Sequence, residues 1–171
     1  MSKGVTITAS PGADTYRAGG TLVSGVNTTD VGNVTTGEDN LMTFSLLANT
    51  LSVDGDRIEI EAAFSLGATA NAKTVKFHFG ATAAYTTGTL AINNGVMVIR
   101  ATVIRTGAAT QDILVTASSN NALLTTALLA AYTTAAETLS GAVTVKFTGE
   151  GTDTDDIIQK IMTVKFYPVN S

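Results

Sequence analysis

The stretch RIEIEAAF, residues 57–64, alternates charged and apolar side chains with the period of two that a half-buried β-strand requires. A tight-turn sequence, Asp54-Gly55-Asp56, precedes it, so the chain enters this strand from a turn. The residues predicted to face a core are Ile58, Ile60, Ala62 and Phe64, and those predicted to face outward are Arg57, Glu59 and Glu61.

The same alternation recurs in the ranges 41–47, 73–79, 96–105, 111–117, 142–147 and 157–167, with turn-forming residues between them. The predicted inward residues of the middle runs are Val75, Phe77, Phe79, Met97, Ile99, Ala101, Val103, Ile113, Val115, Ala117, Val143, Val145 and Phe147. Strands at this spacing, without a long helical pattern, predict an all-β fold, an antiparallel β-sandwich of jelly-roll-like type. Residues 119–141 fit the pattern poorly, and we expect mostly loop there, with one strand or a helical turn.

The last run, residues 157–167, is apolar on both of its predicted faces. One face would carry Ile158, Met162, Val164 and Phe166, and the other would carry Ile157, Ile161 and Tyr167. A strand with two apolar faces is either buried inside the fold or shared with another subunit. The second alternative makes Ile157, Ile161 and Tyr167 candidate residues of an assembly interface.

The N-terminal segment, residues 1–37, has too few large apolar residues to form a core of its own. Short alternating stretches occur around Val5 and Ile7 and around Leu22. These features predict an extended N-terminal arm attached to a body of residues 38–171. The arm would become ordered on a neighbouring molecule, with Val5, Ile7 and Leu22 as interface residues. The alternatives are a flexible tail and one extra edge strand.

Charge is sparse for a chain of 171 residues, because 14% of the residues are charged whereas 44% are hydrophobic. A monomer with so few surface charges associates readily, so we expect a component of a larger assembly. The net charge of −4 argues against a nucleic-acid partner. We expect the chain to be made in the cytoplasm and not to insert into a membrane. The sequence shows neither a membrane-length apolar run nor a signal-peptide pattern.

Few side chains suggest catalysis. The single histidine, His78, lies on the outward side of a predicted strand without a cysteine or serine partner for a nucleophilic relay. Glu59 and Glu61 share a strand face with Arg57, which favours ion pairing over the paired acid–base chemistry of glycoside hydrolysis. We therefore predict no catalytic residue and no cofactor.

The densest acidic stretch, residues 152–156, contains Asp153, Asp155 and Asp156 after a glycine-flanked segment. Alternating oxygen ligands of this kind suit Ca²⁺. The glycine and glutamate positions of an EF-hand loop are missing, however, so a solvated hairpin tip is favoured and the three aspartates are only weak metal candidates.

Several stretches resemble a β-sandwich domain that recurs in virion proteins of tailed bacteriophages. They are GEDNLM at 37–42, FSLLANTL at 44–51, DGDRIEI at 54–60, NAKTVK at 71–76, FGAT at 79–82 and IRTG at 104–107. The resemblance covers residues 37–118 and carries no catalytic residue. It implies a β-sandwich and a structural place in the virion, in a head-associated protein or in a tail fibre or spike.

The working hypothesis is a non-enzymatic virion structural protein that is made in the host cytoplasm. Its first form is a homotrimeric capsid decoration protein, which binds the major capsid protein or other virion proteins and stabilises the head. The alternative form is a trimeric tail fibre, spike or receptor-binding tip, which would need exposed aromatic side chains for its ligand. An enzyme is disfavoured because no acid–base pair stands out.

Overall fold

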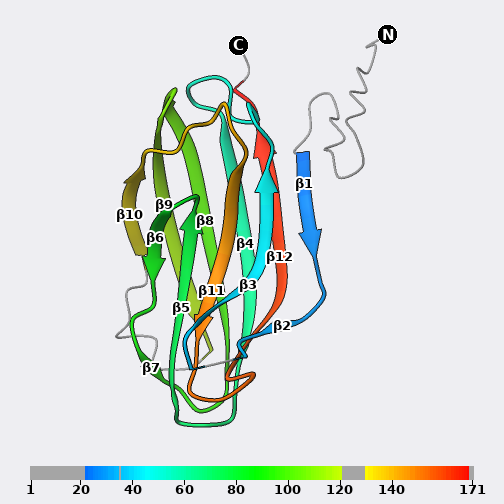
Figure 1. The fold of residues 1–171 in the computed structure, drawn as a ribbon, viewed down its shortest axis with the longest axis vertical. Coiled ribbons are helices and arrows are strands. Elements are labelled where there is room, and N and C mark those ends of the chain that lie inside the picture. The colour runs from blue at the N-terminus through cyan, green and yellow to red at the C-terminus, as the bar shows by residue number, and fades with distance from the viewer. Residues whose placement is uncertain (1–21, 35, 121–129, 170–171) are drawn as a thin grey trace.

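The computed structural model describes residues 22–34, 36–120 and 130–169 of the chain. These residues form two antiparallel sheets packed face to face (Figure 1), which confirms the predicted antiparallel β-sandwich. Among them, no helix is long and apolar enough to cross a membrane.

One sheet has seven strands in the order β1-β12-β4-β8-β9-β10, with the short β2 also paired to β12. The strand bounds are Leu22–Asn27 for β1, Val31–Gly32 for β2, Arg57–Leu66 for β4, Gly95–Gly107 for β8, Thr110–Ser119 for β9, Ala130–Ala135 for β10 and Ile157–Tyr167 for β12.

The other sheet has five strands in the order β3-β11-β5-β6, with the short β7 paired to β5. The bounds are Glu38–Leu46 for β3, Ala72–Phe79 for β5, Thr82–Thr86 for β6, Leu90–Ala91 for β7 and Val143–Glu150 for β11. Because β11 lies between β3 and β5, and β12 between β1 and β4, the C-terminal strands complete both sheets.

Three phenylalanines join the sheets at the centre of the core. The ring of Phe147 on β11 lies 5.3 Å from that of Phe64 on β4 and 5.1 Å from that of Phe77 on β5, measured between ring centroids. All three side chains are buried, and such pairs contribute about 0.5–1.5 kcal/mol beyond the burial of their area. The contact therefore joins the inner faces of the two sheets in one core.

The predicted inward faces of β4, β5, β8, β9 and β11 are confirmed, because their apolar residues at alternate positions are buried. The poorly patterned range 119–141 contains the strand β10, in agreement with the expectation of one strand, and its residues 121–129 lie outside the described residues.

The predicted faces of β12 are wrong at its start. The register with β4 shifts between Gln159 and Ile161, so Lys160 is an extra residue without a partner position on β4. Before Lys160 the odd-numbered side chains point inward, and after it the even-numbered ones do. Ile157, predicted on the outer interface face, is fully buried in the core, and Ile158, predicted inward, is only half-buried. A side chain without exposed surface cannot contact another subunit, so Ile157 is a core residue. Ile161 and Tyr167 are partly exposed, and their interface role stays a prediction.

The second half of the predicted arm belongs to the body's own sheet. Within residues 22–34, which we call the strap, β1 and β2 both pair antiparallel with β12. Asn33 is fully buried and exchanges hydrogen bonds with Ile157 in both directions, at 3.0 Å from its backbone N–H and 2.9 Å to its side-chain oxygen. The edge-strand alternative therefore describes residues 22–34, including Leu22 in β1. Val5 and Ile7 lie outside the described residues.

Candidate functional site

The outer face of the seven-stranded sheet is apolar over part of β12, β4 and β8. Ile161, Ala63 and Val98 are direct cross-strand neighbours, and the next row contains Ile158 and Val96. Val96 is 48% exposed, and Val26 on β1 is 59% exposed. Cross-strand neighbours on one face lie within about 5.5 Å of each other. We call the group of Val26, Ala63, Val96, Val98, Ile158 and Ile161 the outer apolar patch. Two small polar residues lie within it, Ser65 between Ile158 and Val96 and Thr163 beside Val26.

Ion pairs border the outer apolar patch. Lys160 binds Asp30 of the strap at 2.5 Å on one side, and Arg100 binds Glu61 at 2.6 Å on another. Each pair is internally neutral, so the patch can meet an uncharged surface without leaving a single charge buried beside it.

The two glutamates of β4 each pair with an arginine, as the favoured interpretation of RIEIEAAF predicts. Glu61 has its partner in Arg100, and Glu59 lies 3.4 Å from Arg57, whose guanidinium stacks 4.6 Å above the ring of Tyr167. The carboxylates thus belong to an ion-paired strand face. Tyr167 contributes an aromatic ring to the same face.

A second exposed apolar pair lies near the other edge of this sheet. Leu114 on β9 is directly opposite Tyr132 on β10, and they are 51% and 67% exposed. A hydrogen bond with Asp112 raises the pKa of the Tyr132 hydroxyl. An exposed tyrosine beside an aliphatic side chain is a small aromatic platform of the kind that receptor recognition uses.

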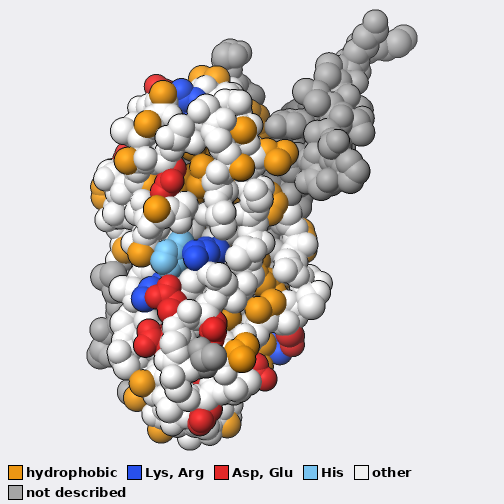
Figure 2. Space-filling model, viewed as in Figure 1, with side chains coloured by type: hydrophobic (Ala, Val, Ile, Leu, Met, Phe, Trp, Pro, Cys, Tyr) orange, Lys and Arg blue, Asp and Glu red, His pale blue; other side chains and the backbone are white. Residues whose placement is uncertain are grey.

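The outer face of the five-stranded sheet is polar, and Figure 2 shows the histidine with basic and acidic side chains in the middle of it. Glu38 accepts hydrogen bonds from Lys76 and, at 2.7 Å, from the hydroxyl of Thr148, and its carboxylate lies 3.2 Å from Nε2 of His78. The hydrogen bonds from Lys76 and Thr148 lower the pKa of Glu38 to about 2. Burial lowers the pKa of His78, while Glu38 acts in the opposite direction. The histidine is therefore a hydrogen-bonded member of a surface cluster.

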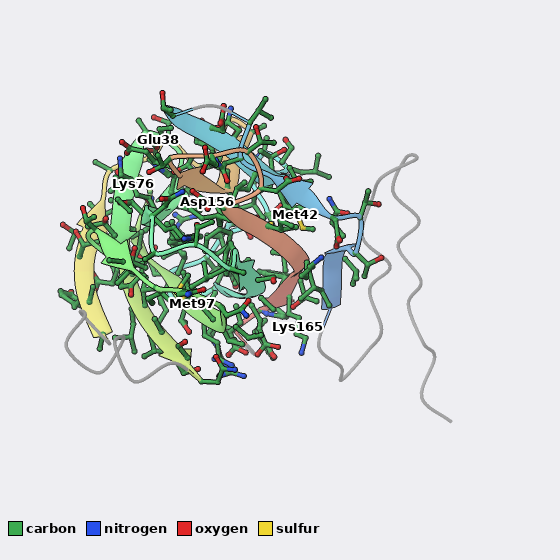
Figure 3. The ribbon with its side chains drawn as sticks, turned by 90° about the horizontal axis from the view of Figure 1, so that it is seen from below. Glu38, Met42, Lys76, Met97, Asp156 and Lys165 are labelled. Atoms are coloured by element: carbon green, nitrogen blue, oxygen red, sulfur yellow. The ribbon has the colours of Figure 1, made fainter. Side chains whose placement is uncertain are left out.

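The acidic stretch does not bring its three aspartates together. Asp153 and Asp155 are exposed, whereas Asp156 is buried at the end of the sandwich seen in Figure 3. Its carboxylate accepts hydrogen bonds from the backbone N–H groups of Thr152 and Asp153, at 3.0 and 2.9 Å, and from the Thr69 hydroxyl at 2.6 Å. Among the described residues, no group of three acidic, histidine or cysteine side chains could hold a metal ion.

Burial raises the pKa of Asp156, but the hydrogen bonds from Thr69, Asp153 and Asn71 outweigh it and lower that pKa to about 2. The group remains ionised although it is buried, because its oxygens are satisfied by donors of its own chain.

The sequence interpretation missed the polar residues that are fully buried, namely Asn33, Lys73, Gln111 and Gln159. The burial of Lys73 could have been predicted, because alternate residues of a strand share a face and Lys73 alternates with Val75, Phe77 and Phe79. No such signal existed for Gln159, whose side-chain oxygen accepts the backbone N–H of Met42 at 2.9 Å, because the bulge at Lys160 sets its direction.

Comparison with known proteins assigns no family to the chain. No family model matches the chain, and no curated protein matches it. Among solved structures, it is similar to the CBM2 module of the evolved Dit protein of Lactobacillus casei BL23 phage J-1. The identity is 6%, the alignment covers 82% of this chain and 77% of that chain, and the TM-score is 0.38. A similarity of this degree carries no argument about function, so the function is argued from the surfaces.

Proposed function

We propose that the chain is a non-enzymatic structural protein of a tailed-bacteriophage virion, and specifically a capsid decoration protein that forms homotrimers and binds the major capsid protein. The outer apolar patch is the observation that carries the proposal. The resemblance of residues 37–118 to virion β-sandwich domains supplies the phage context.

The mechanism is stabilisation by mass action. A protein that binds the closed shell and not its separated subunits lowers the free energy of the closed state by an amount that rises with its concentration. The outer apolar patch would supply the contact between bodies, since short aliphatic side chains on a sheet face bury area with little loss of conformational freedom. Tyr167 and Ile161, at the same face of β12, belong to this proposed contact.

The proposed capsid contact uses residues 1–21, with Val5 and Ile7 as its apolar side chains. These residues precede β1, which is hydrogen-bonded to β12 at the edge of the seven-stranded sheet. An extended segment can add a strand to a sheet edge of its partner, with main-chain hydrogen bonds supplying affinity.

The test is co-sedimentation of the purified chain with empty phage shells that lack it. The full chain is expected to bind the shells, and a chain lacking residues 1–21 is expected to bind at least tenfold more weakly while keeping the circular dichroism of a folded sheet protein. Equal binding by the two chains contradicts the role of the N-terminal segment.

The second candidate is a trimeric tail fibre or receptor-binding tip. The exposed pair Tyr132 and Leu114 favours it, because receptor recognition uses aromatic platforms. Binding of the fluorescently labelled chain to host cells separates the candidates. Cell binding that is lost in Tyr132→Ala, together with no binding to shells, would replace the decoration hypothesis by the receptor-binding one.

A further inference from the structure

Lys73, near the start of β5, is fully buried although it is charged. Its Nζ donates to the backbone oxygens of Thr69 at 2.8 Å and of Asn71 and Ile92, both at 3.2 Å. The hydroxyl oxygen of Thr69 lies at 3.1 Å, and a carboxylate oxygen of Asp156 lies at 3.5 Å. Oxygen atoms from three separate loops thus surround one buried positive charge, as they do around a bound cation in proteins.

The loop of Asp156 is in turn attached to the strap. Asn33 donates from its side-chain amide to the backbone oxygen of Asp153 at 2.9 Å, and its own backbone oxygen accepts the N–H of Asp155 at 2.9 Å. The two segments are in close contact, because a Cβ atom on Gly32 would lie 1.8 Å from a carboxylate oxygen of Asp155. Loop and strap therefore cannot move independently without breaking these contacts.

We propose that the ammonium group of Lys73 acts as a resident cation, in the place that a metal ion would take, and that through Asp156 and Asn33 it fastens the strap to the body. The inference goes beyond the proposed function, since it concerns how the fold closes at one end. It also explains why the acidic stretch has the composition of a cation-binding loop although its buried carboxylate faces a lysine.

The physical reason is that a buried charge left without its partner is unfavourable. Without Lys73, the Asp156 carboxylate and the backbone oxygens of two further loops lose the positive charge that faces them in a site closed to water. The loop would have to open to rehydrate these groups. Because Asn33 holds the strap to that loop, the backbone amides of β1 and β2 would lose protection against hydrogen exchange when the loop opens.

The test compares hydrogen exchange of residues 22–34, followed by mass spectrometry, in four variants of the full chain. Lys73→Met keeps the length of the side chain and removes its charge, and Asp156→Asn keeps the shape of the carboxylate and removes its charge. Both are expected to exchange in the strap at least tenfold faster than the unchanged protein. The matched control is Lys160→Met, which removes an exposed ion pair with Asp30 of the same strap. It is expected to change the hydrogen-exchange rate of the strap less than threefold.

The fourth variant, Lys73→Ala, tests the role of the charge itself. It leaves space for a small cation, so methylammonium chloride is expected to restore strap protection, whereas tetramethylammonium chloride at equal ionic strength is too large and is expected not to. Unchanged strap exchange in Lys73→Met or Asp156→Asn would overturn the fastening role. Failure of methylammonium to restore Lys73→Ala, including failure to restore its folding, would overturn the resident-cation role.

Discussion

The two outer faces of the sandwich rest on the same core but present different chemistry. The seven-stranded sheet presents the outer apolar patch with ion pairs at its borders. The five-stranded sheet presents the cluster of Glu38, Lys76 and His78. Since a solvated sheet face needs only polar residues to be stable, folding alone does not require aliphatic side chains on the first face. The difference supports the proposal that the first face contacts another protein, while the second has the composition of a solvated face.

The largest expected effect comes from the core that both faces share. Phe147→Ala removes the ring that contacts Phe64 and Phe77, and we expect it to lower the free energy of unfolding by about 3–5 kcal/mol. Urea unfolding followed by circular dichroism measures the loss. Leu114→Ala, at a half-exposed position of an outer face, is the control and is expected to cost less than about 1 kcal/mol. Equal losses of unfolding free energy in the two variants would contradict a central role of the Phe147 ring in the stability of the sandwich.

A smaller effect concerns the polar face and its dependence on pH. Because the pKa of Glu38 is about 2 in the folded chain and near 4.5 when unperturbed, its contribution to stability is complete above pH 4.5 and is lost as the pH falls towards 2. The side chain is about one-third exposed, so we expect a contribution of only about 1 kcal/mol.

Glu38→Gln measures this contribution without changing the shape of the side chain. The difference in unfolding free energy between it and the unchanged chain is expected to be about 1 kcal/mol at pH 6 and to vanish near pH 2. The comparison cancels the titration of Asp156, which loses its own stabilising effect in a similar range. A difference that persists at pH 2 would show that the ionised carboxylate is not responsible.

The smallest effect is expected at the border of the outer apolar patch. Arg100 and Glu61 are both more than half exposed, and exposed pairs contribute about 0.2–1 kcal/mol. A double-mutant cycle of Arg100→Ala and Glu61→Ala, measured by urea unfolding of dilute protein, is expected to give a coupling energy below about 0.5 kcal/mol. A coupling above about 2 kcal/mol would show that this pair is a stability element of the monomer rather than a neutral border.

The sequence predicted the parts of the fold that local alternation controls. Phe64, Phe77 and Phe147 are inward because the period of two is unbroken around each of them. Prediction failed at Ile157, because the extra residue at Lys160 changes the phase within one strand and the alternation itself does not show where.

Prediction was incomplete where long-range partners decide, because an edge strand was only one of the alternatives for the N-terminal segment. Residues 22–34 have too few apolar residues to indicate a strand by themselves, and they are held by β12 and by the buried amide of Asn33. The burial of Lys73 follows from the alternation of its strand. Its hydrogen-bond partners do not, because they lie in separate loops that no local sequence pattern places together.

Whether the outer apolar patch is the assembly surface can be decided by sedimentation velocity of the unchanged chain and of Val98→Asp, both at micromolar concentration. Thr144→Asp, which adds the same charge to an exposed position of the polar face, is the control. We predict that the unchanged chain and Thr144→Asp sediment as trimers, and that Val98→Asp dissociates at least tenfold more readily, because it places a charge within the outer apolar patch. A stable monomer for the unchanged chain, or equal sedimentation of Val98→Asp and Thr144→Asp, would contradict the claim that this face is the assembly surface.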